Sequence, residues 1–117
     1  MAFTVKRAYD PPDPGDGTRV LVDRLWPRGL TKDRARIDEW LKDLTPSNEL
    51  RQWYHEDPAG RGKEFDRRYR AELKGEAQSA AVDRLKELAG EGPVTLVTSA
   101  KDVEHSHVPV LVRHVSP

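Results

Sequence analysis

Two short segments of the sequence concentrate the side chains that could do chemistry. Residues 23–29 are Asp-Arg-Leu-Trp-Pro-Arg-Gly and follow the apolar run Val20-Leu21-Val22. Residues 98–107 combine hydroxyls, a lysine, carboxylates and two histidines, and follow the apolar run 94–97. In sheets of parallel strands, ligands bind beyond the carboxyl ends of the strands. If the two runs are neighbouring strands, both segments therefore contribute to one crevice.

The side-chain types in this crevice suit an anionic ligand, because arginine offers a two-pronged donor to phosphate or carboxylate groups. Arg24, Arg28 and Lys101 are predicted to hold the anion. Ser99 is predicted to donate a hydrogen bond to it, and Trp26 to stack on the ligand. The leading functional prediction is an α/β protein that binds an anionic small molecule, such as a phosphate-bearing one, or a nucleotide, with no cofactor.

A second hypothesis makes the same crevice the active site of a hydrolase or transferase. The acid–base candidates are Asp23, Asp102, His105 and His107. Covalent catalysis also needs a nucleophile. The chain contains no cysteine, so only Ser99, Thr98 or a bound water could serve.

Each of these residues also has an ordinary structural interpretation. Asp23 and Arg24 could pair with neighbours at a sheet edge, and Trp26 could belong to the core. Lys101-Asp102 could be a surface pair that contributes little to stability. The two histidines could be a hydrogen-bond donor at a helix start and a packed imidazole. The sequence by itself does not choose among these alternatives.

A third hypothesis is a protein- or nucleic-acid-interaction module. A protein partner would need an exposed apolar patch within residues 46–90. Arg67-Arg68-Tyr69-Arg70, with Arg61 and Lys63 before it, forms a local basic patch. We expect this patch to be a solvated helix face paired with Glu64, Asp66 and Glu72. Because twenty basic side chains balance twenty acidic ones, we expect nucleic-acid binding to be weak and salt-sensitive at most.

No metal site is expected. The absence of cysteine excludes disulfides, a thiolate nucleophile and cysteine-ligated zinc. His105 and His107 are two residues apart, about 200° around a helix, so a regular helix could not turn both toward one metal. Gly60-Arg61-Gly62-Lys63 has Asp57 and Glu64 where a phosphate-binding loop needs a glycine and a hydroxyl.

Length and composition favour one domain spanning residues 1–117. No apolar run approaches the roughly 20 residues of a membrane span. The start MAFTVKR lacks the apolar region of a secretory signal. We therefore expect a cytoplasmic protein with no membrane partner, whose oligomeric state the sequence does not indicate.

Periodicity predicts an α/β fold with a mainly parallel sheet and helices packed on it. Alternation and continuous apolar runs predict strands at residues 3–7, 18–25 and 94–98. Helical spacing and capping signals predict helices over 32–35, from about 46 to 54, from about 63 to 74, over 81–88 and over 104–115, with Pro109 in a first turn. Ile37, Trp40, Leu41 and Leu44 also recur at helical spacing, which predicts a helix over 37–44.

The same residues carry a family resemblance. Tyr9-Asp10-Pro11-Pro12, the string from Val20 to Leu30, the string from Asp38 to Leu44, and Lys101-Asp102 with Glu104-His105 resemble the YeaO-like branch of the family called domain of unknown function 488. The resemblance covers nearly the whole chain, and its Asp-Arg-Leu-Trp-Pro-Arg-Gly string is long and distinctive. It brings no established activity.

The resemblance implies that other branches of that family have a cysteine at the end of the strand that corresponds to residues 94–98. They also have a Cys-His-Arg string at the helix that follows this strand. The corresponding positions here are Thr98 and Ser106-His107-Val108, so the resemblance implies that thiol chemistry is absent from this chain. It also implies that residues 37–44 contain a sheet strand, which leaves that segment open between helix and strand.

Overall fold

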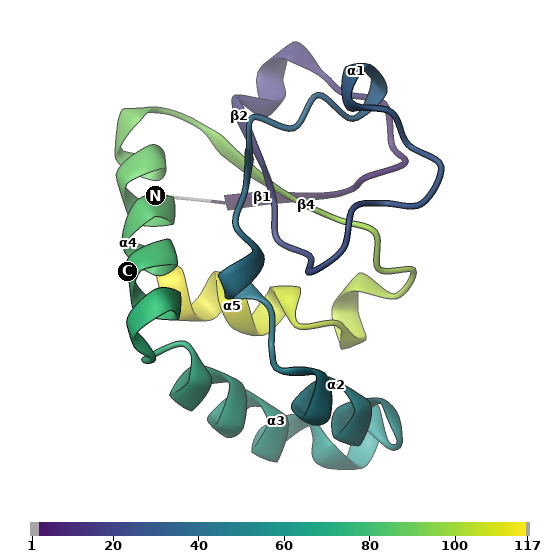
Figure 1. The fold of residues 1–117 in the computed structure, drawn as a ribbon, viewed down its shortest axis with the longest axis vertical. Helices are drawn as coiled ribbons and strands as arrows, with labels where there is room; N and C mark the ends of the chain where they lie inside the picture. Colours follow the sequence, from purple (N-terminus) through teal and green to yellow (C-terminus); the bar gives the residue numbers. More distant parts are fainter. Residues whose placement is uncertain (1–2, 117) are drawn as a thin grey trace.

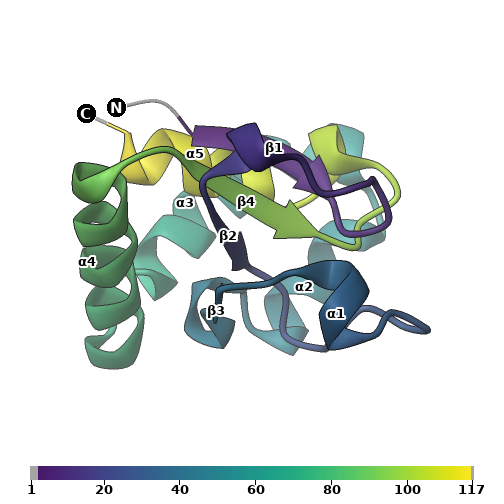
Figure 2. The same ribbon diagram turned by 90° about the horizontal axis from the view of Figure 1, so that it is seen from above.

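The strands form one four-stranded parallel sheet. A computed structural model describes residues 3–116, in which β1 (Phe3–Arg7), β4 (Val94–Thr98), β2 (Thr18–Leu21) and β3 (Glu39–Trp40) lie side by side in that order (Figure 2). Every neighbouring pair is parallel. Parallel strands need crossover connections, and helices supply most of them here. The predicted α/β fold with a parallel sheet is confirmed.

β4 lies inside the sheet, between β1 and β2, and all five of its residues are buried. This burial is expected of a strand that is covered on both faces. Val20 pairs with Leu96, and Leu21 pairs with Val97. Since successive side chains of a strand point to opposite faces, Val20 and Leu96 face one layer of the molecule. Leu21 and Val97 face the other.

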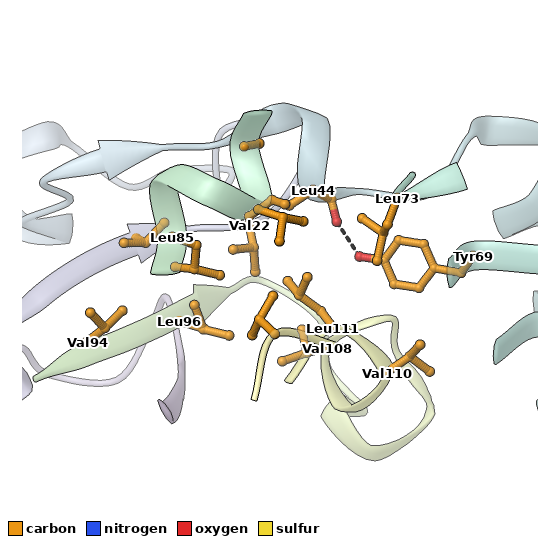
Figure 3. Close-up of a cluster of buried hydrophobic side chains, with 14 of the residues drawn as sticks. Val22, Leu44, Tyr69, Leu73, Leu85, Val94, Leu96, Val108, Val110 and Leu111 are labelled. Atoms are coloured by element: carbon orange, nitrogen blue, oxygen red, sulfur yellow. Dashed lines mark hydrogen bonds between the residues drawn. The ribbon is translucent and has the colours of Figure 1, made fainter. Parts of the chain in front are cut away.

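The main hydrophobic core lies on the first of these faces, against four helices. These are α2 (Asn48–His55), α3 (Pro58–Glu72), α4 (Glu76–Glu91) and α5 (Val108–Val115). In Figure 1, α5 runs below the strands, α2 and α3 lie lower still, and α4 runs along the left side. Figure 3 shows Leu96 of the sheet in one cluster with Leu85 of α4 and Leu111 of α5. No helix within residues 3–116 combines the length and apolar character that crossing a bilayer requires.

A smaller cluster covers the opposite face of the sheet. Ala8, Leu21 and Val97 are buried there, and Trp26 and Trp40 pack against them. The short helix α1 (Lys32–Ala35) lies at the far end of the molecule from α2 and α3 (Figure 1). The sheet is therefore enclosed by a large core on one side and a small one on the other.

The helix predicted by periodicity over residues 37–44 is wrong. The segment contains the edge strand β3, which pairs with β2, followed by the 3₁₀ turn η2 (Lys42–Leu44). Ile37 and Trp40 pack with the smaller cluster. Leu41 and Leu44 join the main core. One face of a helix cannot serve both sides of a sheet, so the helical spacing was coincidental, and the strand implied by the family resemblance is correct.

Several predicted boundaries also need correction. β2 ends at Leu21 rather than at residue 25. Ser47 caps α2, so Pro46 precedes this helix instead of lying in its first turn. Asp57 caps α3, which therefore starts at Pro58, well before residue 63. The predicted helix over 104–115 is divided into the 3₁₀ turn η3 (Val103–His105) and α5, and Pro109 lies in the first turn of α5 as predicted.

A buried ion cluster joins the first two strands on the smaller face. Asp16, which is 6% exposed, accepts from the Arg19 guanidinium at 2.6 Å and from Lys6 Nζ at 2.7 Å. It also accepts from the backbone N–H of Asp13 at 3.1 Å. Arg19, only 3% exposed, donates twice to the carbonyl oxygen of Ala35, at 3.2 and 3.0 Å. These bonds fix the proline-rich loop and α1 against the sheet.

Asp16→Asn should lower the free energy of unfolding by about 3–5 kcal/mol, because it leaves the buried Arg19 without its counter-ion. Burial by itself would raise the pKa of Asp16. The hydrogen bonds from Lys6, the Asp13 amide and Arg19 outweigh that effect and hold this pKa below its ordinary value. The ionised carboxylate therefore stabilises the fold above about pH 4, and this contribution is lost as the pH falls through the lowered pKa of the folded state.

Urea denaturation of the wild type and Asp16→Asn over a range of pH checks this prediction. The stability gap should be largest near neutral pH and should narrow below about pH 4. Asp83→Asn is the control, because Asp83 is exposed on α4 and forms no ion pair with the rest of residues 3–116. The control should change stability by less than about 0.5 kcal/mol. A gap that stays constant at every pH would contradict the role given to the Asp16 carboxylate.

Candidate functional site

The segments that follow β2 and β4 share one pocket, as the sequence predicts. The pocket has a volume of about 480 Å³ and lies beyond the carboxyl ends of these two strands. Residues 23–25 and 98–102 line one part of it, and residues 105–107 line another. The face of α2 that carries Arg51, Tyr54 and His55 completes the enclosure.

Asp23 ties the two strand ends together at this pocket. Its Oδ1 accepts from the hydroxyl of Thr98 at 2.7 Å. Its Oδ2 accepts from the backbone N–H and the hydroxyl of Ser99, at 2.7 and 2.8 Å. A carboxylate accepts hydrogen bonds through both oxygens, so all three donors can bind it at once. Asp23, which is 9% exposed, thus has a structural role in shaping the loop after β4.

Further bonds hold that loop in place. Arg7, at the end of β1, donates from Nε to the carbonyl oxygen of Ala100 at 3.0 Å. The backbone N–H of Ala100 donates to the Thr98 hydroxyl at 3.2 Å. The backbone that carries Lys101 is therefore anchored from two neighbouring strands before any ligand binds.

The opposite wall, formed by the chain between η2 and α2, is anchored as well. The hydroxyl of Tyr69 donates to the carbonyl oxygen of Leu44, the bond drawn in Figure 3. Glu72 accepts from both the backbone N–H and the hydroxyl of Ser47, at 2.8 and 2.7 Å. Glu72 therefore caps this wall and does not pair with the basic face of α3, contrary to the prediction. Hydrogen bonds to other parts of the chain thus hold both walls of the pocket in place.

Three basic side chains line the pocket. Arg24 is partly committed, because its guanidinium donates to the carbonyl oxygen of Pro46 at 2.9 Å. Arg51 and Lys101 form no side-chain hydrogen bond or ion pair with any other residue between 3 and 116. The positive charge of these two side chains is thus available to a ligand.

The two carboxylates that line the pocket are already engaged. Asp23 is held by its three donors. Asp102 Oδ2 lies 2.7 Å from His105 Nδ1 in an exposed pair. The hydrogen bond from His105 lowers the pKa of Asp102, and the same contact raises the pKa of His105. Neither carboxylate is left to neutralise Arg51 or Lys101 directly.

His107 is a half-buried titratable side chain of the pocket. Its Nε2 lies 2.7 Å from the carbonyl oxygen of Val22, and its ring packs edge-on against Tyr69 with 6.0 Å between ring centroids. Burial is the main cause that lowers the pKa of His107. The imidazole is therefore neutral at neutral pH.

The structure leaves Trp26 and Arg28 outside the pocket. The Trp26 ring packs edge-on against Trp40 at 5.6 Å, and its indole N–H donates to the carbonyl oxygen of Leu30 at 2.6 Å. Arg28 is exposed in the following turn, where its carbonyl oxygen accepts from the Tyr9 hydroxyl at 3.0 Å. After Leu25 the chain turns toward the smaller face of the sheet, so Trp26 takes the structural role that the sequence offered as its alternative.

Ser99 lines the pocket without the donor role predicted for it. Its hydroxyl proton and its backbone N–H both go to Asp23. A serine hydroxyl carries one proton, so toward a ligand Ser99 can only accept. The sequence could not reveal this, because the partner is 76 residues away along the chain.

Sequence reasoning missed the contribution of α2. Arg51, Tyr54 and His55 are three and four residues apart, so they share one helical face, and that spacing was visible in the sequence. No sequence signal, however, places this face over the ends of β2 and β4. Tyr54 adds an apolar wall, since its ring stacks on Phe65 with 4.0 Å between centroids.

Residues 3–116 contain no arrangement typical of nucleophilic catalysis. The hydroxyls of Thr98 and Ser99 both donate to Asp23, and no histidine contacts either hydroxyl. Within the same described residues there is also no group of three metal-ligating side chains placed to hold an ion. The geometry is that of a shaped, positively charged pocket.

Comparison with known proteins agrees with the family resemblance. Residues 2–116 match the family model described as the inactive DUF488-N3 subclade. The chain is 49% identical over 109 residues to an uncharacterized protein of Mycobacterium tuberculosis, which covers 93% of this chain and 89% of that protein. It is 43% identical over 111 residues to the uncharacterized protein YeaO of Escherichia coli, which covers 95% of this chain and 94% of YeaO. No solved structure matches the chain.

The match to the family model spans almost every residue of the chain, and the relatives are similar over nearly their full lengths. Two of the strings that suggested the family, residues 20–30 and residues 101–105, lie at the ends of β2 and β4 and contribute residues to the pocket. This chain belongs to the DUF488 family as a YeaO-like member of the DUF488-N3 subclade described as inactive.

Proposed function

We propose that this protein binds an anionic small molecule, such as a nucleotide, in the pocket at the carboxyl ends of β2 and β4. One observation carries the proposal. Arg51 and Lys101 line the pocket without a partner among residues 3–116, whereas both carboxylates in it are already hydrogen-bonded. Both side chains are exposed to solvent at the pocket, and their hydrogen bonds to an anion would be charge-assisted and therefore stronger than hydrogen bonds between neutral groups.

The size and walls of the pocket support a small molecule. Ligand pockets typically measure about 300–1,000 Å³ and combine apolar walls with a few polar groups. This pocket of about 480 Å³ has the Tyr54 ring, Leu25 and Pro46 beside its basic side chains. A ligand with an apolar or planar part next to its anionic group would contact both kinds of wall.

Binding is better supported than catalysis. The two hydroxyls available as nucleophiles are committed to Asp23, and His107 donates to a backbone carbonyl. The description of the subclade as inactive points the same way. The hydrolase or transferase hypothesis would need a water activated by a histidine, either His105, which is exposed and paired with Asp102, or His107, whose Nε2 is bonded to Val22.

An interaction module has less support than a ligand pocket. The exposed apolar patch that it requires is missing from residues 46–90, since the large exposed hydrophobic side chains are Tyr9 and Leu25. On the basic face of α3, Arg67 and Arg68 pair with Glu64, and Arg70 pairs with Asp66. These pairs leave few free charges for phosphates, so weak, salt-sensitive nucleic-acid binding stays our expectation.

Arg51→Ala and Lys101→Ala should each weaken ligand binding by about tenfold to a hundredfold, the cost of losing one charged hydrogen-bond partner. Thermal shift with a panel of inorganic phosphate, nucleoside monophosphates and dicarboxylates would find a ligand, and isothermal titration calorimetry would measure its affinity. Folding should be little affected, because both side chains are exposed and neither forms a side-chain hydrogen bond or ion pair within the described residues.

Arg28→Ala and Lys86→Ala are the matched controls for this experiment. Both remove an exposed cation that lies outside the pocket, Arg28 in the loop after β2 and Lys86 on α4. Affinities equal to that of the wild type are expected for both. If the controls and the pocket variants weakened binding equally, the anion would be responding to net charge and the pocket would be misplaced.

Arg24→Ala should lower both affinity and stability. Its guanidinium lines the pocket but also donates to the Pro46 carbonyl, and losing that bond should cost about 0.5–1.5 kcal/mol of folding free energy. Comparing the melting temperature and the ligand affinity of Arg24→Ala with those of Arg28→Ala separates the structural role of Arg24 from its role in ligand binding. A lowered melting temperature with unchanged affinity would make Arg24 a structural residue only.

A further inference from the structure

The hydrogen bond between His107 and Val22 determines which nitrogen of the imidazole carries the proton. A carbonyl oxygen only accepts, so His107 Nε2, at 2.7 Å from the Val22 oxygen, must be the donor. In a neutral imidazole the other nitrogen is then an acceptor. Nδ1 of His107 therefore presents a lone pair.

This lone pair is accessible and unused. No hydrogen bond joins Nδ1 of His107 to another side chain or backbone group within residues 3–116. Nor is Nδ1 sealed from solvent, since the described residues contain no fully buried side-chain nitrogen or oxygen that lacks a partner. His107 lines the pocket, so a ligand bound there would meet Nδ1 where this atom is exposed on the pocket side.

The surroundings of His107 keep the ring neutral and place it among the cations of the pocket. Burial is the largest influence that lowers its pKa, and the charge of Arg51 and the ring of His55, both on α2, lower it further. The hydrogen bond to the Val22 carbonyl and the charge of Asp23 raise the pKa of His107, but these effects are smaller than those that lower it. Arg51 and His107 line the same pocket, so one ligand can contact both.

We infer that the pocket selects anions that carry a hydrogen-bond donor, and in particular that it distinguishes hydrogen phosphate from sulfate through Nδ1 of His107. The inference rests on the proposed function, since it concerns the same pocket. The two anions have the same tetrahedral shape and the same charge of −2. Hydrogen phosphate has one P–OH group, whereas sulfate offers acceptors only.

The expected selectivity follows from hydrogen-bond matching. Arg51 and Lys101 donate to either anion equally. Nδ1 of His107 accepts a hydrogen bond from the P–OH group of hydrogen phosphate. Sulfate has no such donor, so its oxygen and Nδ1 are two acceptors that repel each other. An acceptor left without a donor typically weakens binding by about tenfold to a hundredfold.

Isothermal titration calorimetry of the whole protein with sodium phosphate and with sodium sulfate tests the inference. Chloride keeps the ionic strength constant, and the pH is one at which phosphate is the hydrogen-phosphate dianion. We expect the wild type to bind phosphate at least about tenfold more tightly than sulfate. Equal affinities would overturn the inference and leave the proposed function standing, whereas no binding of either anion would overturn both.

The variant His107→Phe tests the role of Nδ1. Phenylalanine keeps an aromatic ring beside Tyr69 but has no hydrogen-bond acceptor. The preference for phosphate over sulfate should therefore disappear. His114→Phe, on α5 outside the pocket, is the matched control and should keep the wild-type preference. A preference that survives His107→Phe would overturn the inference.

A second measurement does not depend on the stability of that variant. Long-range ¹⁵N–¹H correlation spectra of the wild type report the tautomer of each histidine. We expect His107 to be protonated at Nε2 and bare at Nδ1, and its Nδ1 resonance to shift with phosphate but not with sulfate. A proton on Nδ1 in the free protein, or equal shifts with both anions, would contradict the inference.

Discussion

The buried carboxylate of Asp23 is the interaction on which the arrangement of the site depends. It sits where β2 ends and takes three hydrogen bonds from the end of β4, including both donors of Ser99. A charge this enclosed is tolerated only when donors surround it, so the two strand ends must stay in register. The backbone carbonyl oxygens of Val22 and of Asp23 itself also accept hydrogen bonds. Trp40 donates to the carbonyl of Asp23 at 2.7 Å, and His107 donates to that of Val22.

This arrangement gives the pocket acceptors near the strand ends and uncommitted cations on α2 and on the loop after β4. The family resemblance places a cysteine of other branches at the position of Thr98. In this chain Thr98 is fully buried and its hydroxyl donates to Asp23, so the position serves the scaffold. The committed hydroxyls and the description of the subclade as inactive both agree with the proposal that the pocket binds a ligand and does not transform it.

A small protein can support such a site because polar contacts reinforce its limited core. The smaller face of the sheet has few buried apolar side chains, and the buried pair of Asp16 and Arg19 secures the loops there. On the larger face, the Tyr69 hydroxyl and Glu72 fix the chain that leads into α2. The bonds of Tyr69 and Glu72 join residues 25 positions apart in the sequence, and they fix the segment that leads to Arg51, which lines the same pocket as Lys101.

The sequence by itself determined the α/β class, the buried strands β2 and β4, the family, and the meeting of the segments that follow those strands. Local patterns carry such information, because apolar runs mark buried strands and parallel strands end at the same edge. Only the tertiary structure decided that residues 37–44 divide between two cores, that Trp26 turns away from the pocket and that Arg51 faces into it. The physical reason is that each outcome depends on which layer of the molecule a segment packs against. Periodicity shows that a segment has an apolar side, but only the packed fold determines what covers it.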